Sequence, residues 1–96
     1  FPVSQGHTLI IPNRHVCDFL ELTLDEMSAV FELLQVARNT LDGRYRPPGY
    51  NVGVNIGKLA GQTVMHAHVH LIPRFCGDVP DPVGGIRNLI AGKGHY

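Results

Sequence analysis

The chain has 96 residues, of which 44% are hydrophobic, and its eight Lys and Arg residues balance its eight Asp and Glu residues. This length and composition predict one compact domain near the lower end of the usual size range. A balanced charge without a basic run argues against a nucleic-acid or anionic-membrane partner, and no apolar run is long enough to span a bilayer.

The cysteine content and the small size of the chain indicate its cellular compartment and its oligomeric state. Cys17 and Cys76 are the only cysteines, which is too few for a disulfide scaffold, so we expect reduced thiols in a cytoplasmic protein. The N-terminus lacks the charged and then apolar pattern of a signal peptide. Because a small domain buries a small fraction of its surface, we expect a homodimer.

The first half of the chain predicts a strand followed by a long helix. The β-branched and apolar run 8–11 lies between Gly6 and Pro12, which is typical of a mostly buried strand. The sequence from Thr23 to Glu26 fits a capping box and predicts a helix start, and Gly43 is placed to end that helix. Apolar residues recur at spacings of three and four and define the predicted core-facing stripe: Met27, Val30, Phe31, Leu34, Ala37 and Leu41.

The middle of the chain predicts an antiparallel hairpin. In residues 50–56 the apolar side chains alternate with a face made of Asn51, Gly53 and Asn55. After a turn over residues 57–61, the return strand carries three histidines at alternate positions, His66, His68 and His70, and directs Met65, Ala67, Val69 and Leu71 to the opposite face. The histidines therefore share a face with the Asn and Gly residues, and this face has the room and the polar groups of a pocket floor. The Gly- and Pro-rich residues after Arg74 predict loop.

Three explanations compete for the histidine row. The side chains could be tolerated on a solvated strand face, but three in strict register are unusual. Two of them could share a Zn²⁺ ion, although carboxylate ligands are missing nearby and same-face strand residues lie roughly 6.5 to 7 Å apart. The third explanation is nucleophilic catalysis, in which a neutral imidazole attacks phosphorus and forms a covalent intermediate.

The segment from Gln62 to Ile72 resembles the signature of the histidine triad (HIT) family, in which three histidines alternate with apolar residues. The similarity extends to Gly6-His7-Thr8-Leu9-Ile10-Ile11-Pro12 and to the Asn55-Ile56-Gly57 turn, and covers most of the chain up to Arg74. It implies an α+β fold, with an antiparallel β-sheet packed against one long α-helix, that dimerises. On this resemblance residues 1–96 form one HIT-like domain that lacks the N-terminal segment of the family.

The resemblance also implies an activity and roles for particular residues. It implies a hydrolase or nucleotidyl transferase that attacks the α-phosphate of a nucleotide, with His68 as the nucleophile. His70 then protonates the leaving group and His66 orients the nucleophile through a hydrogen bond. The residues expected to bind the substrate are Asn55, Gln62, Thr63 and His7; an ordinary strand-end hydrogen bond is the alternative for His7. No metal ligands are expected in the protein, and Mg²⁺ enters, if at all, with a polyphosphate substrate.

Within the family, Ile72-Pro73-Arg74 resembles the dinucleoside polyphosphate hydrolases more than the enzymes that cleave purine nucleoside phosphoramidates. His70 argues against the transferase branch, which has glutamine there. The expected substrate is therefore a dinucleoside polyphosphate. A phosphoramidase, and a nucleotide-binding signalling module with little turnover, stay open as alternatives.

Overall fold

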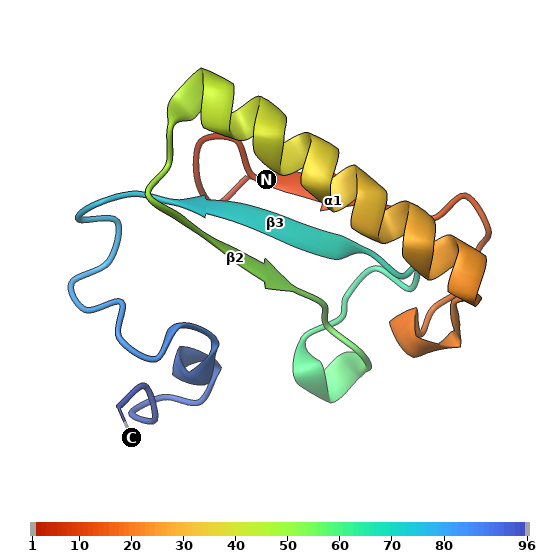
Figure 1. Ribbon diagram of the computed structural model, residues 1–96. Helices are drawn as coiled ribbons and strands as arrows, with labels where there is room; N and C mark the ends of the chain where they lie inside the picture. Colours follow the sequence, from red (N-terminus) through yellow and green to blue (C-terminus); the bar gives the residue numbers. More distant parts are fainter. Residues whose placement is uncertain (1, 96) are drawn as a thin grey trace.

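The computed structural model describes residues 2–95, and in it one long helix lies across a small sheet (Figure 1). The helix α1 spans Leu24–Tyr45. The strands are β1 (Thr8–Ile10), β2 (Gly49–Gly53) and β3 (Val69–Arg74), and three short 3-10 helices are η1 (Phe19–Glu21), η2 (Lys58–Ala60) and η3 (Gly85–Leu89). Within the described residues, no helix combines the length and the apolar character needed to cross a bilayer.

The start of α1 is the capping box that the sequence predicts. The Thr23 hydroxyl accepts the Glu26 backbone N–H, and the Glu26 carboxylate accepts the Thr23 backbone N–H at 2.9 Å. The predicted end at Gly43 is wrong, because the helix continues for two further residues. Arg46, rather than a glycine, takes the left-handed conformation with φ of 50° and donates its N–H to the Asp42 carbonyl, and Pro47 follows.

The sheet is antiparallel in the order β1-β3-β2, so β3 is its central strand. Val69 lies opposite Ile10, and His70 lies between Leu9 of β1 and Gly53 of β2. This arrangement of one antiparallel sheet against one long helix confirms the predicted fold class.

The strand predicted over residues 8–11 ends at Ile10 and is not mostly buried, because Leu9 and Ile11 are exposed. Two other predicted strands are also longer than the strands in the structure. The strand predicted over residues 50–56 ends at Gly53, and the predicted return strand begins only at Val69. Both differences follow from pairing: β1 ends at Ile10, just before Pro12, so residues ahead of Val69 meet no strand on that side. His66 and His68 therefore lie in irregular backbone that leads into β3, and one backbone hydrogen bond, from Ala67 N–H to the Val16 carbonyl, holds this approach.

The core lies between α1 and the sheet. Val69, Leu71 and Pro73 point from β3 toward α1 and are buried, whereas His70, Ile72 and Arg74 lie on the opposite face. The buried hydrophobic residues are Ile10, Val16, Leu22, Val30, Leu41, Ala67, Val69 and Leu71. Several apolar positions predicted to face the core are wrong: Phe31 of α1 is 63% exposed, Val52 and Ile56 on the apolar face of residues 50–56 are exposed, and Met65 is exposed because its segment has not yet joined the sheet.

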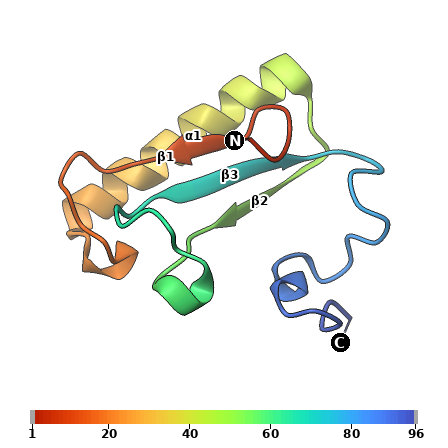
Figure 2. The same ribbon diagram turned by 180° about the vertical axis from the view of Figure 1, so that it is seen from behind.

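The residues after β3 form the predicted loop, apart from the short helix η3. Both ribbon views place this C-terminal segment and α1 on opposite sides of the sheet (Figures 1 and 2). Arg74 begins the segment, pairs with Asp78 at 2.7 Å and donates to the Asn51 side-chain oxygen at 2.6 Å. The C-terminal segment is therefore tied to β2.

Candidate active site

Three histidines from two distant segments, His7, His68 and His70, lie in mutual contact at one end of the central strand. His70 points from β3, and its ring lies edge-on to the His68 ring with centroids 5.0 Å apart. His7, just ahead of β1, stacks on His70 with centroids 5.2 Å apart. His66 lies farther along the approach to β3. The structure thus brings His7, His68 and His70 together, with only His70 in a strand, while the His66 ring contacts other residues.

One ring nitrogen of His68 forms a hydrogen bond within the protein, and the other is available to react. Its Nδ1 lies 2.8 Å from the main-chain oxygen of His66, and a carbonyl oxygen can only accept, so Nδ1 carries the proton. In the neutral ring the lone pair is then on Nε2. This is the form of imidazole that can attack an electrophile.

His66 contacts His68 through its main chain. The hydrogen bond that orients His68 goes to the main-chain carbonyl of His66 and not to its imidazole. The imidazole donates from Nε2 to the Pro12 carbonyl at 2.9 Å, and His15 lies edge-on to it with centroids 5.1 Å apart. The side chain of His66 therefore anchors the approach to β3 against the segment after β1.

His7 and His70 form a second hydrogen-bonded unit. The backbone N–H of Val3 donates to His7 Nδ1 at 3.1 Å, which leaves the proton of a neutral His7 on Nε2. His7 Nε2 lies 2.9 Å from His70 Nδ1 and donates to it. Neutral His70 must then carry its own proton on Nε2, where it is available as a donor.

The electrostatics of this pair favour the neutral form. Partial burial lowers the pKa of His7 and of His70 below the ordinary imidazole value. For His70, positive charge on His68 and His7 lowers the pKa further. Both rings are consequently neutral at neutral pH, as the chain of donors from Val3 to His70 requires.

The predicted substrate-binding residues Asn55, Gln62 and Thr63 lie in different surroundings. Asn55 follows β2 and lines the same pocket as His7 and His70. Thr63 is exposed in the turn that precedes the triad. Gln62 is only 3% exposed: its Oε1 accepts the Gly57 N–H at 2.9 Å, and its Nε2 donates to the Cys17 and Val64 carbonyls. Because both N–H bonds of Gln62 are used inside the protein, its visible role is to hold the turn together.

A pocket of about 350 Å³ opens beside His70. Its polar lining includes His7, His70, Asn51 and Asn55, and Gly53 leaves room on β2. The sequence predicted this union of the histidine face with the Asn and Gly face of the neighbouring strand. It did not predict that Ile86 and Leu89 of η3 complete the lining, because no periodic pattern links that segment to the sheet.

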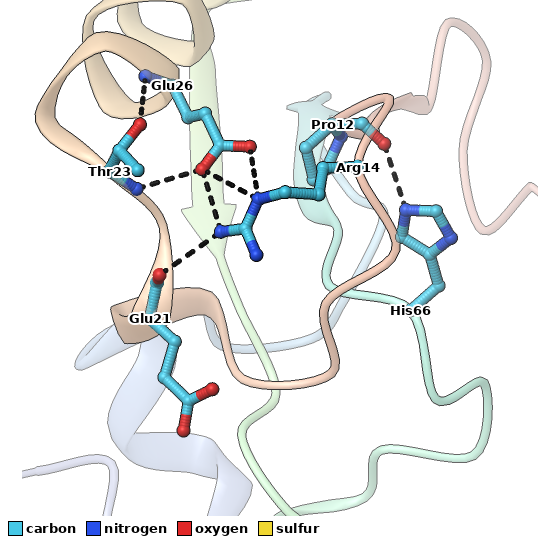
Figure 3. Close-up of polar contacts among 6 residues, drawn as sticks. All are labelled: Pro12, Arg14, Glu21, Thr23, Glu26 and His66. Atoms are coloured by element: carbon cyan, nitrogen blue, oxygen red, sulfur yellow. Dashed lines mark hydrogen bonds and ion pairs between the residues drawn. The ribbon is translucent and has the colours of Figure 1, made fainter.

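A polar network outside the pocket supports His66 and was also missed (Figure 3). Arg14 forms an ion pair with Glu26 at 2.9 Å and donates to the Glu21 carbonyl, which ties the segment carrying Pro12 to the start of α1. The Arg14 hydrogen bond, followed by that of Thr23, lowers the pKa of Glu26 to about 2. The capping box was recognisable in the sequence, but the twelve-residue reach from Arg14 to Glu26 leaves no sequence signal.

Among residues 2–95, no group of three or more His, Cys, Asp or Glu side chains is arranged to hold a metal ion. The histidine cluster is instead held by hydrogen bonds to carbonyl groups and between rings. These features define a class of protein: an α+β domain that carries a cluster of hydrogen-bonded histidines beside a pocket.

Comparison with known proteins agrees with this class. The HIT domain matches residues 1–77, and the chain belongs to the histidine triad (HIT) family. It is 37% identical over 79 residues to the AP-4-A phosphorylase of Mycobacterium tuberculosis and 37% identical over 73 residues to the asymmetrical bis(5'-nucleosyl)-tetraphosphatase of Schizosaccharomyces pombe. A crystal structure of a HIT family protein from Bacillus anthracis is 41% identical, with a TM-score of 0.75, over 79% of this chain.

These matches cover most of this chain but less of the other proteins. The matched region is 81% and 76% of this chain for the two enzymes, and 40% of each enzyme. It is 54% of the Bacillus anthracis chain. The chain thus spans about half or less of the length of these three relatives.

Proposed function

We propose that this protein hydrolyses nucleotides at the α-phosphate through a covalent nucleotidyl-histidine intermediate. The observation that carries the proposal is the hydrogen bond from His68 Nδ1 to the His66 carbonyl, which leaves the Nε2 lone pair of His68 free for attack. His70, with its proton on Nε2, lies beside it as a donor.

The proposed reaction has two displacements. His68 Nε2 forms a bond to the α-phosphorus while the bond to the leaving oxygen breaks, and neutral His70 donates a hydrogen bond from Nε2–H to that oxygen, while solvent supplies any proton that the oxygen takes up. A water molecule then attacks the phosphorus, the P–N bond breaks so that neutral His68 is restored, and the proton of the water passes to solvent. The products are a nucleoside monophosphate and the leaving group, and both histidines return to their starting forms.

We propose dinucleoside polyphosphates as the substrates. The support is the names of two similar enzymes, an AP-4-A phosphorylase and a bis(5'-nucleosyl)-tetraphosphatase. Asn55, beside His70 in the pocket, and Thr63, exposed in the turn ahead of the triad, are our candidates for the donors that hold phosphate oxygens. We also propose a cytoplasmic location, in keeping with Cys17 and Cys76, which are both exposed and free.

The test is single-turnover chemistry with a nucleotide labelled at the α-phosphate. Wild-type protein should form an acid-labile labelled adduct and release nucleoside monophosphate, whereas His68→Ala should do neither. Gln35→Ala removes an exposed polar side chain of α1 outside the pocket and should behave as wild type. Unchanged turnover in His68→Ala would overturn the mechanism. Tight nucleotide binding with no turnover in the full chain would favour the binding-module alternative, and faster cleavage of a nucleoside phosphoramidate would favour the phosphoramidase.

A further inference from the structure

The C-terminal segment supplies a wall of the His70 pocket. Ile86 and Leu89 of η3 line the pocket together with Ile72 of β3. Gly85 lies close to β2, since a Cβ added there would be 3.5 Å from Asn51 Nδ2. In Figures 1 and 2 this segment lies on the β2 side of the sheet, away from α1.

Several contacts hold η3 in this position. Arg74 bridges Asp78 and Asn51, which fixes the start of the segment on β2. His95 pairs with Asp81 at 2.6 Å, which closes the segment on itself. The wall is therefore a folded part of the domain with its own hydrogen bonds.

The part of the pocket formed by η3 is apolar, whereas the part that carries His7 and His70 is polar. Ile86 is 61% exposed and Leu89 is 76% exposed, so neither side chain contributes to the core although both are fixed beside the pocket. Apolar surface next to a few placed polar groups is typical of a site for an organic ligand. Asn51 adds a hydrogen-bond donor to the pocket. Its Oδ1 accepts a hydrogen bond from Arg74, which leaves the N–H bonds of its side-chain amide available to a ligand.

The pocket lies on the leaving-group side of the reaction that we propose above. Its lining includes His70, the donor to the leaving group, and does not include His68, the nucleophile. Resting on that proposed function, we infer that η3 binds the nucleoside of the leaving group, with its base against Ile86 and Leu89. A dinucleoside polyphosphate has such a second nucleoside, whereas a mononucleoside polyphosphate does not, so this wall selects between the two substrate classes.

The experiment compares diadenosine tetraphosphate with adenosine 5'-tetraphosphate, which lacks the second nucleoside. We expect Leu89→Ser to lower the ratio of kcat/KM for the first substrate over the second by about 10-fold, and Ile86→Ser to act in the same direction. Leu20→Ser is the matched control, because Leu20 also lies in a 3-10 helix, is 73% exposed and is outside the pocket. An unchanged ratio in both η3 variants, or an equal change in Leu20→Ser, would overturn the inference.

Equilibrium binding separates this inference from the proposed function. In a His68→Ala background, Leu89→Ser should weaken binding of diadenosine tetraphosphate and leave binding of adenosine 5'-tetraphosphate nearly constant. That result supports the subsite even if the wild type shows no turnover, in which case only the proposed function fails. Equal affinity of the His68→Ala protein for both ligands, or affinity for neither, overturns the subsite.

Discussion

His7 donates from Nε2 to Nδ1 of His70 over 2.9 Å, and the two rings stack. Because the Val3 N–H occupies His7 Nδ1, this one hydrogen bond determines which nitrogen of His70 holds its proton. His7 is thus a positioning residue for the proposed hydrogen-bond donor and not only the strand-end histidine of the sequence motif.

We predict that His7→Phe, which retains an aromatic ring but cannot donate, lowers kcat about 10-fold for leaving groups that need the His70 hydrogen bond. A nitrophenyl ester of AMP, whose leaving group needs no such hydrogen bond, should be cleaved at nearly the wild-type rate. The ¹⁵N chemical shifts of the His70 ring should change toward a mixture of tautomers. Equal losses on both substrates would show that His7 does not act through His70.

The same two histidines predict a pH dependence of stability. Their pKa values are lowered in the folded state, so below the unfolded value of about 6.5 the unfolded chain binds more protons than the folded chain. The stability they contribute is therefore present above about pH 6.5 and is lost as the pH falls through the folded values. Urea unfolding at pH 7.5 and pH 5.5 measures this loss, which should be smaller in a His7→Phe, His70→Phe double variant. An identical pH dependence in both proteins would contradict the shifts.

The buried amide of Gln62 predicts a structural effect. Replacing Gln62 with Met removes three hydrogen bonds and leaves the Gly57 N–H and the Cys17 carbonyl without this partner. We expect the free energy of unfolding to fall by about 2 kcal/mol, within the range for unsatisfied buried polar groups. Gln35→Met, on the exposed surface of α1, is the control and should have little effect. A variant with normal stability but a raised KM would instead assign Gln62 to substrate binding.

The capping box predicts a smaller loss. Thr23→Ala removes the side-chain acceptor for the Glu26 N–H and should lower the free energy of unfolding by about 1 kcal/mol. Thr40→Ala is the matched control: Thr40 is exposed in the middle of α1 and bonds only back to the Val36 carbonyl. Chemical denaturation of the two variants checks the difference, and a larger loss in Thr40→Ala would contradict it.

The sequence predicts those parts of the fold that depend on neighbouring residues. Thr23 and Glu26 are three residues apart, so the capping box is local, and alternation alone places Asn51 and Gly53 on the face of His70. The end of α1 was missed because Arg46 adopts the left-handed conformation that the glycine signal assigns to Gly43.

The remaining errors concern contacts between distant residues. The triad was predicted to lie on one strand, but the strand begins where its partners begin, at Val69 opposite Ile10. The partner of the Gln62 amide at Cys17 is 45 residues away, and the place of η3 beside His70 depends on how Arg74 meets Asn51. No periodicity in the sequence records such pairings.

A last prediction concerns self-association, which the size of the chain favours. Phe31 is seven residues before Arg38 and eleven before Asp42, so it shares a flank of α1 with them. Asp42 accepts a hydrogen bond from the Tyr50 hydroxyl at 2.6 Å, which places this flank beside β2. Since β2 is an edge of the described sheet and Val52 on it is half exposed, both the flank of α1 that carries Phe31 and the unpaired edge of β2 are open to a partner.

We predict that a second copy of the chain covers this flank of α1 together with the edge of β2, and that Phe31→Glu converts a homodimer into a monomer. Leu33→Ser is the control, because Leu33 has a similar exposure but lies two positions along α1, where the helical twist turns it to the other flank. Light scattering over a range of concentrations distinguishes the outcomes. A monomeric wild type would contradict dimerisation altogether, and a monomer produced equally by Leu33→Ser would place the interface on another surface, since a contact through the β2 edge cannot depend on both flanks to the same degree.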